Sequence, residues 1–113
     1  YHGMSPMLSH LVHNGHMEPR AYGQKECLEA GIQFARTEGI MPAPEATHAI
    51  KGAVDEALKC KAEGKSKAIL FNLCGHGHFD MQAYMDYFSG NLAEDKFDTE
   101  AFEESMASIP AVN

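Results

Sequence analysis

Long apolar runs, basic residues and paired cysteines are all scarce in this chain of 113 residues. No stretch is long enough to cross a bilayer and no signal-peptide pattern opens the chain, so nothing predicts a membrane protein. Nine basic residues stand against sixteen acidic ones, and the formal charge of −7 argues against partners such as nucleic acid or anionic membranes. Three cysteines, Cys27, Cys60 and Cys74, form no disulfide framework, which favours a reducing, cytoplasmic compartment.

The composition that remains is that of a globular protein, with 44% hydrophobic and 22% charged residues. A chain of this length forms one domain or a piece of one. It opens on Tyr1 rather than on methionine, and we therefore expect an amino-terminal part to precede it.

Capping residues and helical spacing predict five helices along the chain. The predicted helices run from Pro6 to Asn14, Gln24 to Thr37, about Ile50 to Glu63, Asp80 to about Gly90, and Glu100 to Ser108 with Thr99 as its cap.

One good strand and one weak strand complete the predicted order, α-β-α-α-β-α-α. Residues 67–73 are a nearly uninterrupted apolar run, which is typical of a parallel strand buried on both faces. Residues 16–22 are a weaker candidate because they contain Pro19. The predicted fold class is therefore α/β, with a partial, doubly covered parallel sheet. Two strands cannot form a stable sheet alone, so we expect the missing strands to come from elsewhere in a longer chain or from another subunit.

The predicted strand ends in a loop rich in glycine, histidine and cysteine, Cys74-Gly-His-Gly-His-Phe-Asp80. Open α/β sheets bind ligands at the carboxyl ends of their strands. Cys74 is either a small buried side chain or a nucleophile activated by a neighbouring histidine. The series Cys74, His76, His78 and Asp80 also permits a zinc site, although structural zinc sites usually use two separated ligand pairs.

Glu45 follows two prolines and precedes a helix. Its simplest role is a favourable charge at the helix amino terminus, worth well under ~1 kcal/mol when exposed.

Two segments together resemble the carboxy-terminal region of tryptophan synthase beta chains. They are Glu38-Gly-Ile-Met-Pro-Ala-Pro-Glu-Ala-Thr-His-Ala-Ile50 and Ile69-Leu-Phe-Asn-Leu-Cys-Gly-His-Gly-His-Phe-Asp80. The Gly-His-Gly-His-Phe-Asp form and the opening Tyr1-His-Gly-Met-Ser-Pro6 are similar to the type 2 branch of the family. The resemblance covers about residues 1–90, which would be the carboxy-terminal part of that domain, followed by an acidic linker and a terminal helix over 91–113.

The resemblance implies a fold-type II pyridoxal-phosphate enzyme that joins L-serine and indole into L-tryptophan, working as a homo-oligomer. Glu45 matches the glutamate beside the cofactor ring, which supports proton transfers. Cys74, followed by Gly75, matches the position that hydrogen-bonds the pyridine nitrogen, where the familiar residue is serine. Tyr1 and Gly3 match the segment that contributes to a monovalent-cation site.

The family's cofactor lysine is missing from this sequence. Members hold the cofactor on the lysine of a His-Lys pair, yet none of the seven histidines here precedes a lysine, and no glycine-rich phosphate loop is present. The resemblance therefore implies that the 113 residues alone are inactive. The alternative is a stand-alone binding or oligomerisation module that keeps the scaffold without the chemistry.

Overall fold

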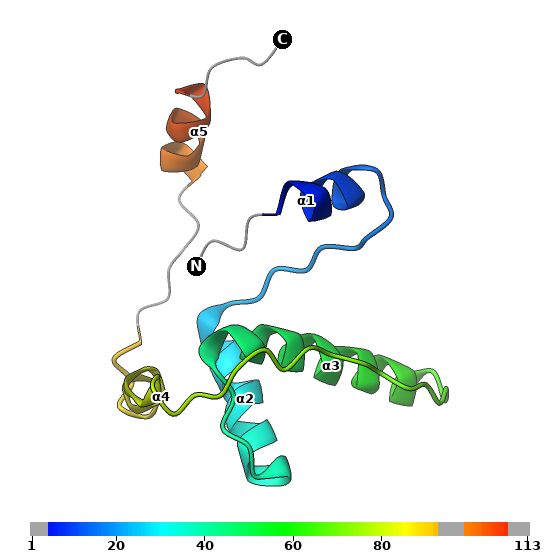
Figure 1. Ribbon diagram of the computed structural model, residues 1–113, viewed down its shortest axis with the longest axis vertical. Helices are drawn as coiled ribbons and strands as arrows, with labels where there is room; N and C mark the ends of the chain where they lie inside the picture. The colour runs from blue at the N-terminus through cyan, green and yellow to red at the C-terminus, as the bar shows by residue number, and fades with distance from the viewer. Residues whose placement is uncertain (1–4, 93–98, 109–113) are drawn as a thin grey trace.

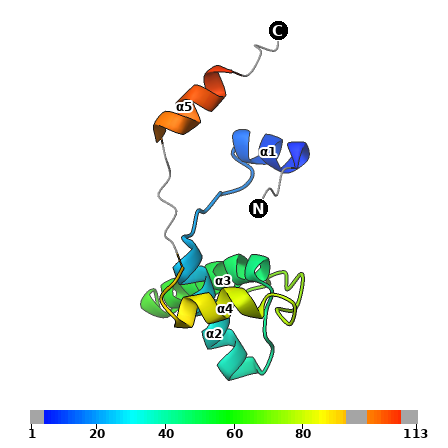
Figure 2. The same ribbon diagram turned by 90° about the vertical axis from the view of Figure 1, so that its left-hand side faces the viewer.

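Five helices make up most of the part of the chain that the computed structural model describes, residues 5–92 and 99–108 (Figure 1). They are α1 (Pro6–His13), α2 (Gln24–Glu38), α3 (Pro44–Ala62), α4 (Met81–Phe88) and α5 (Thr99–Ala107). Helices α2, α3 and α4 pack together, whereas α1 and α5 lie apart from them in both views (Figures 1 and 2) and have no buried residue. None of these helices is long and apolar enough to span a bilayer.

All five predicted helices are confirmed, four of them with small shifts at their ends and α3 with an earlier start. The Ser5 hydroxyl accepts the Leu8 N–H at 3.4 Å at the start of α1, and Gly39, at a φ of +72°, ends α2 as a left-handed cap. Helix α3 begins at Pro44, earlier than expected, because proline fits the first helical turn. Asp80 occupies the predicted cap position of α4, but its side chain makes no capping hydrogen bond there.

Helices α2 and α3 approach each other closely at Gly31. A Cβ atom on Gly31 would lie 2.5 Å from Cγ2 of Thr47, so only glycine permits this spacing. Around the crossing, α2 buries Cys27 and Leu28, and α3 buries Ile50. Helix packing therefore brings the first turn of α3, which carries Glu45, firmly against α2.

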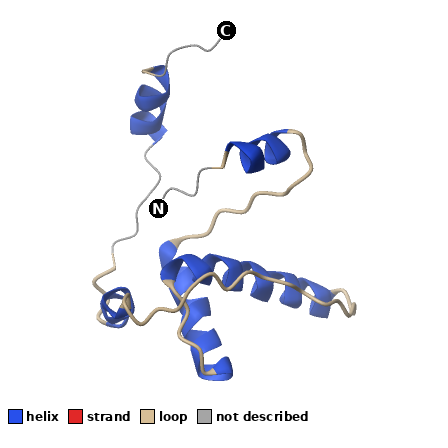
Figure 3. Cartoon of the chain, viewed as in Figure 1, coloured by secondary structure: helices blue, strands red, loops and turns tan. Residues whose placement is uncertain are grey.

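The predicted parallel sheet is wrong for the described residues, which contain no strand (Figure 3). Residues 67–73 are extended but pair with no other segment of the described chain, and residues 16–22 likewise form no strand. The expected burial on both faces is also wrong, since Leu70 is 99% exposed. Phe71 packs edge-on against Phe34, with ring centroids 5.7 Å apart. A strand needs a neighbouring backbone, and the described residues supply none.

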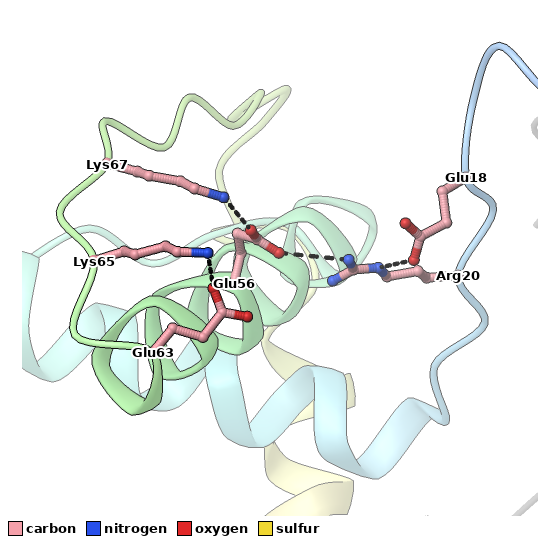
Figure 4. Close-up of polar contacts among 6 residues, drawn as sticks. All are labelled: Glu18, Arg20, Glu56, Glu63, Lys65 and Lys67. Atoms are coloured by element: carbon pink, nitrogen blue, oxygen red, sulfur yellow. Dashed lines mark hydrogen bonds and ion pairs between the residues drawn. The ribbon is translucent and has the colours of Figure 1, made fainter.

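Ion pairs hold both extended segments against α3 (Figure 4). Arg20 lies between Glu18, at 3.1 Å, and Glu56 of α3, at 3.5 Å. Lys67 reaches the other carboxylate oxygen of Glu56 at 3.3 Å. Exposed pairs of this kind stabilise a fold little, so they orient the two segments rather than supply much folding energy.

Candidate functional site

The loop before α3 and the Gly-His-Gly-His loop lie side by side, although more than thirty residues separate them in the sequence. The Ala43 N–H donates to the Gly75 carbonyl at 2.9 Å, and the Gly77 N–H donates to the Met41 carbonyl at 2.8 Å. These bonds form an isolated antiparallel bridge. The structure therefore brings together the two segments that carry the sequence resemblance.

The Tyr84 side chain of α4 stabilises the loop before α3 in its pairing with the Gly-His-Gly-His loop. Its side chain is 1% exposed, and its hydroxyl donates to the Pro42 carbonyl at 2.6 Å. Leu28 and Ile32 of α2 form a buried cluster with Tyr84. Burial raises the pKa of Tyr84 to about 12, so the phenol keeps its proton and remains a donor at neutral pH.

Replacing Tyr84 with phenylalanine is expected to lower the free energy of unfolding by about 1–3 kcal/mol, because the buried Pro42 carbonyl loses its side-chain donor. Urea unfolding followed by circular dichroism measures the change. Tyr87→Phe, one turn later and half-buried, is the matched control and should change stability by less than about 0.5 kcal/mol. Equal losses in the two variants would show that the Tyr84 hydroxyl has no special role.

The predicted site residues Glu45 and Cys74 flank the Ala43–Gly75 hydrogen bond in the sequence, and these two positions are called the rim. Glu45 is the second residue of α3, two positions after Ala43, and Cys74 directly precedes Gly75. Both side chains are exposed, and Cys74 is a free thiol, so each is accessible to a ligand. Tyr1 and Gly3, the predicted cation-site residues, lie outside the described residues.

The rings of the two loop histidines contact each other at a tilted angle rather than converge on an ion. The rings of His76 and His78 lie 4.8 Å apart, Phe79 stacks on His76 at 5.4 Å, and the His78 N–H donates to Nδ1 of His76 at 3.3 Å. In the described ranges, no three His, Cys, Asp or Glu side chains are placed to hold a metal ion. The zinc alternative at Cys74, His76 and His78 therefore finds no support.

A contact between Cys27 and His48 is a second polar feature, beside the Tyr84 hydrogen bond, that the sequence did not predict. Cys27 Sγ lies 3.2 Å from Nδ1 of His48, one helical turn after Glu45. Helical spacing placed Cys27 on the apolar face of α2, and it is buried there. No sequence signal identifies a partner 21 residues away on another helix.

The Cys27 thiol gives the fold a predicted weakness at alkaline pH. Burial raises its pKa from 9.0 to about 11. Because the folded-state pKa is the higher one, this contribution to stability is complete below about pH 9 and is lost as pH rises toward 11. The free energy of unfolding, measured at intervals from pH 7 to 11, should fall above pH 9 in the natural chain. A smaller fall is expected for Cys27→Ala, and identical pH profiles would contradict the prediction.

Known proteins similar to this chain are tryptophan synthase beta chains. It is 62% identical over 92 residues to tryptophan synthase beta chain 2 of Methanosarcina mazei, a match covering 81% of this chain and 21% of the relative. It is 55% identical over 94 residues to tryptophan synthase beta chain 2 of Aquifex aeolicus, and this match covers 83% of this chain and 22% of the relative. The beta chain of Pyrococcus horikoshii is 44% identical over 110 residues, covering 97% and 24%. No protein-family model matches, and the chain spans about a fifth of the length of these relatives.

Proposed function

We propose, since the chain belongs to the tryptophan synthase beta-chain family, that it forms the carboxy-terminal wall of a pyridoxal-phosphate site that joins L-serine and indole into L-tryptophan. The observation that supports the proposal is the Ala43–Gly75 hydrogen bond, because it joins the two segments that carry the exposed Glu45 and Cys74 side chains. The sequence contains no His-Lys pair or glycine loop, so the cofactor lysine and phosphate site must come from the rest of the polypeptide.

The exposed side chains of the rim, a carboxylate and a thiol, have the chemistry that a cofactor ring requires. Pyridoxal phosphate supplies an electron sink for negative charge that develops on the substrate. The Cys74 thiol would hold the pyridine nitrogen of the cofactor through a weak hydrogen bond. The Glu45 carboxylate would accept and return protons beside the ring. Gly75 leaves room for the close approach of the loop, since a Cβ there would lie 3.3 Å from that of Ala43.

The unpaired segment of residues 67–73 supports a further part of the proposal, which concerns the sheet of the complete protein. We propose that it becomes a strand of the parallel sheet of a fold-type II enzyme, paired with strands from the remainder of the protein. The exposure of Leu70, an aliphatic side chain in an unpaired extended run, favours such a partner. Homo-oligomeric assembly, a cytoplasmic location consistent with three free cysteines, and a monovalent cation near Tyr1 and Gly3 belong to the same proposal.

A fusion tests the proposal. The 113 residues replace the matching segment of the Methanosarcina mazei relative, and cofactor absorbance and L-tryptophan formation from L-serine and indole are measured. The isolated chain serves as the control and should neither bind the cofactor covalently nor turn over. A folded fusion that binds no pyridoxal phosphate would overturn the proposal, as would turnover by the isolated chain.

Cys74 offers a sharper check within the fusion. A hydroxyl is a stronger donor than a thiol, so Cys74→Ser should bind the cofactor at least as tightly as the natural residue. Cys74→Ala removes the donor, and the Kd for pyridoxal phosphate should rise about tenfold, which corresponds to one hydrogen bond. Equal affinities for the serine and alanine variants would contradict a hydrogen bond from this position.

A stand-alone oligomerisation module is the second candidate, and the unpaired segment 67–73 is the observation that favours it. An open edge of this kind invites pairing between copies. Light scattering of the purified chain distinguishes the two. A stable oligomer in which Leu70→Lys causes dissociation would favour the module, and a monomer would favour the enzyme fragment.

A further inference from the structure

The contact between Cys27 and His48 joins α2 to the first turn of α3. Cys27 is 1% exposed, and its sulfur lies 3.2 Å from Nδ1 of His48. His48 itself is exposed. One ring nitrogen is therefore held by a buried group, and the side chain as a whole remains accessible.

The buried thiol suits one of the two neutral tautomers of the His48 ring better than the other. Burial raises the pKa of Cys27 to about 11, so the thiol is protonated at neutral pH. A protonated thiol donates, and the lone pair of a neutral imidazole accepts. If Nδ1 of His48 accepts from the thiol, the ring proton lies on Nε2.

His48 shares the accessible side of the first turn of α3 with Glu45. Residues three apart on a helix are neighbours, with Cβ atoms about 5–6 Å apart. Glu45 and His48 are exposed, whereas Ala46, Thr47 and Ile50 are buried against the core. A ligand that touches Glu45 is therefore within reach of the His48 ring.

We propose that His48 donates a hydrogen bond from Nε2 to an oxygen of the ligand bound beside Glu45, and that Cys27 is the positioning residue that holds this tautomer. The inference rests on the proposed function, because that function supplies the ligand. It adds a second polar group to the rim, supported from α2 rather than from the Gly-His-Gly-His loop.

Nitrogen NMR of the isolated chain tests the positioning step without any cofactor. Two-bond proton–nitrogen correlations should show His48 as the Nε2–H tautomer in the natural chain and in Cys27→Ser, which keeps a donor. Cys27→Ala should shift the Nδ1 resonance toward a mixture of tautomers. Cys60→Ala, another buried cysteine, is the matched control and should leave His48 unchanged. An unaltered His48 spectrum in Cys27→Ala would overturn the role of the thiol.

Kinetics of the fusion test the contact with the ligand. His48→Ala should lower kcat/KM at least about tenfold, the equivalent of one hydrogen bond. His48→Gln presents an amide N–H near the Nε2 position and should recover most of the loss, which a purely structural role would not require. If the His48→Ala fusion binds pyridoxal phosphate and keeps the kcat/KM of the unsubstituted fusion, the inference is overturned. The proposed function would remain intact in that case. A fusion without cofactor binding would overturn both.

Discussion

Replacing Gly77 with alanine is expected to lower the free energy of unfolding by about 3 kcal/mol, the upper range for overpacking a filled interior. A Cβ atom on this residue would collide with the Pro42 carbonyl oxygen and would lie 3.2 Å from the Tyr84 ring. Neither neighbour can move freely, because the first is backbone and the second is held by its hydrogen bond to that same carbonyl. Urea unfolding followed by circular dichroism measures the loss.

Gly52 provides the matched control for this substitution. It lies within α3, and a Cβ there would meet only the Tyr22 ring, at 3.8 Å, which is ordinary contact. Gly52→Ala should stabilise the chain by up to about 1 kcal/mol, because alanine favours the helix interior. If Gly77→Ala unfolds at the natural midpoint, the two loops are not packed as closely as their hydrogen bonds indicate.

The helices were predictable because their signals are local. Pro6 begins a helix and Gly39 ends one through conformational preferences that need no distant partner, although the start of α3 at Pro44 was missed. The strand was not predictable in the same way. An apolar run such as residues 67–73 indicates that both faces of a strand will be covered, but it does not show that this chain supplies the cover. Leu70 is exposed because the described residues provide none.

The site was partly predictable for a related reason. The resemblance identified the two loops, and the structure brings them together through Ala43 and Gly75. The support beneath them could not be predicted, because it depends on contacts between distant positions. The hydrogen bond from Tyr84 to Pro42 spans 42 residues, and helical spacing predicts that Tyr84 is buried without identifying its acceptor.

Replacing Glu45 with glutamine in the fusion is expected to lower kcat by about 10²–10⁴, the usual contribution of a positioned acid or base. Glutamine has nearly the same shape but cannot accept and return a proton. KM for L-serine should change little if the carboxylate acts mainly in the chemical step. Steady-state kinetics at several serine concentrations separate the two effects, and cofactor absorbance confirms that the site is filled.

If Glu45 only provides a favourable charge at the helix amino terminus, the expected result of the same substitution is the opposite. A carboxylate that only stabilises the amino terminus of α3 would lower stability by less than about 1 kcal/mol when replaced and would leave kcat unchanged. Glu38→Gln, at the carboxyl end of α2, controls for loss of charge near the same loop and should leave kcat intact. A Glu45→Gln fusion with natural kcat would assign Glu45 to the helix. A loss of kcat without a loss of stability would assign it to the reaction, because the helix charge cannot account for slower turnover.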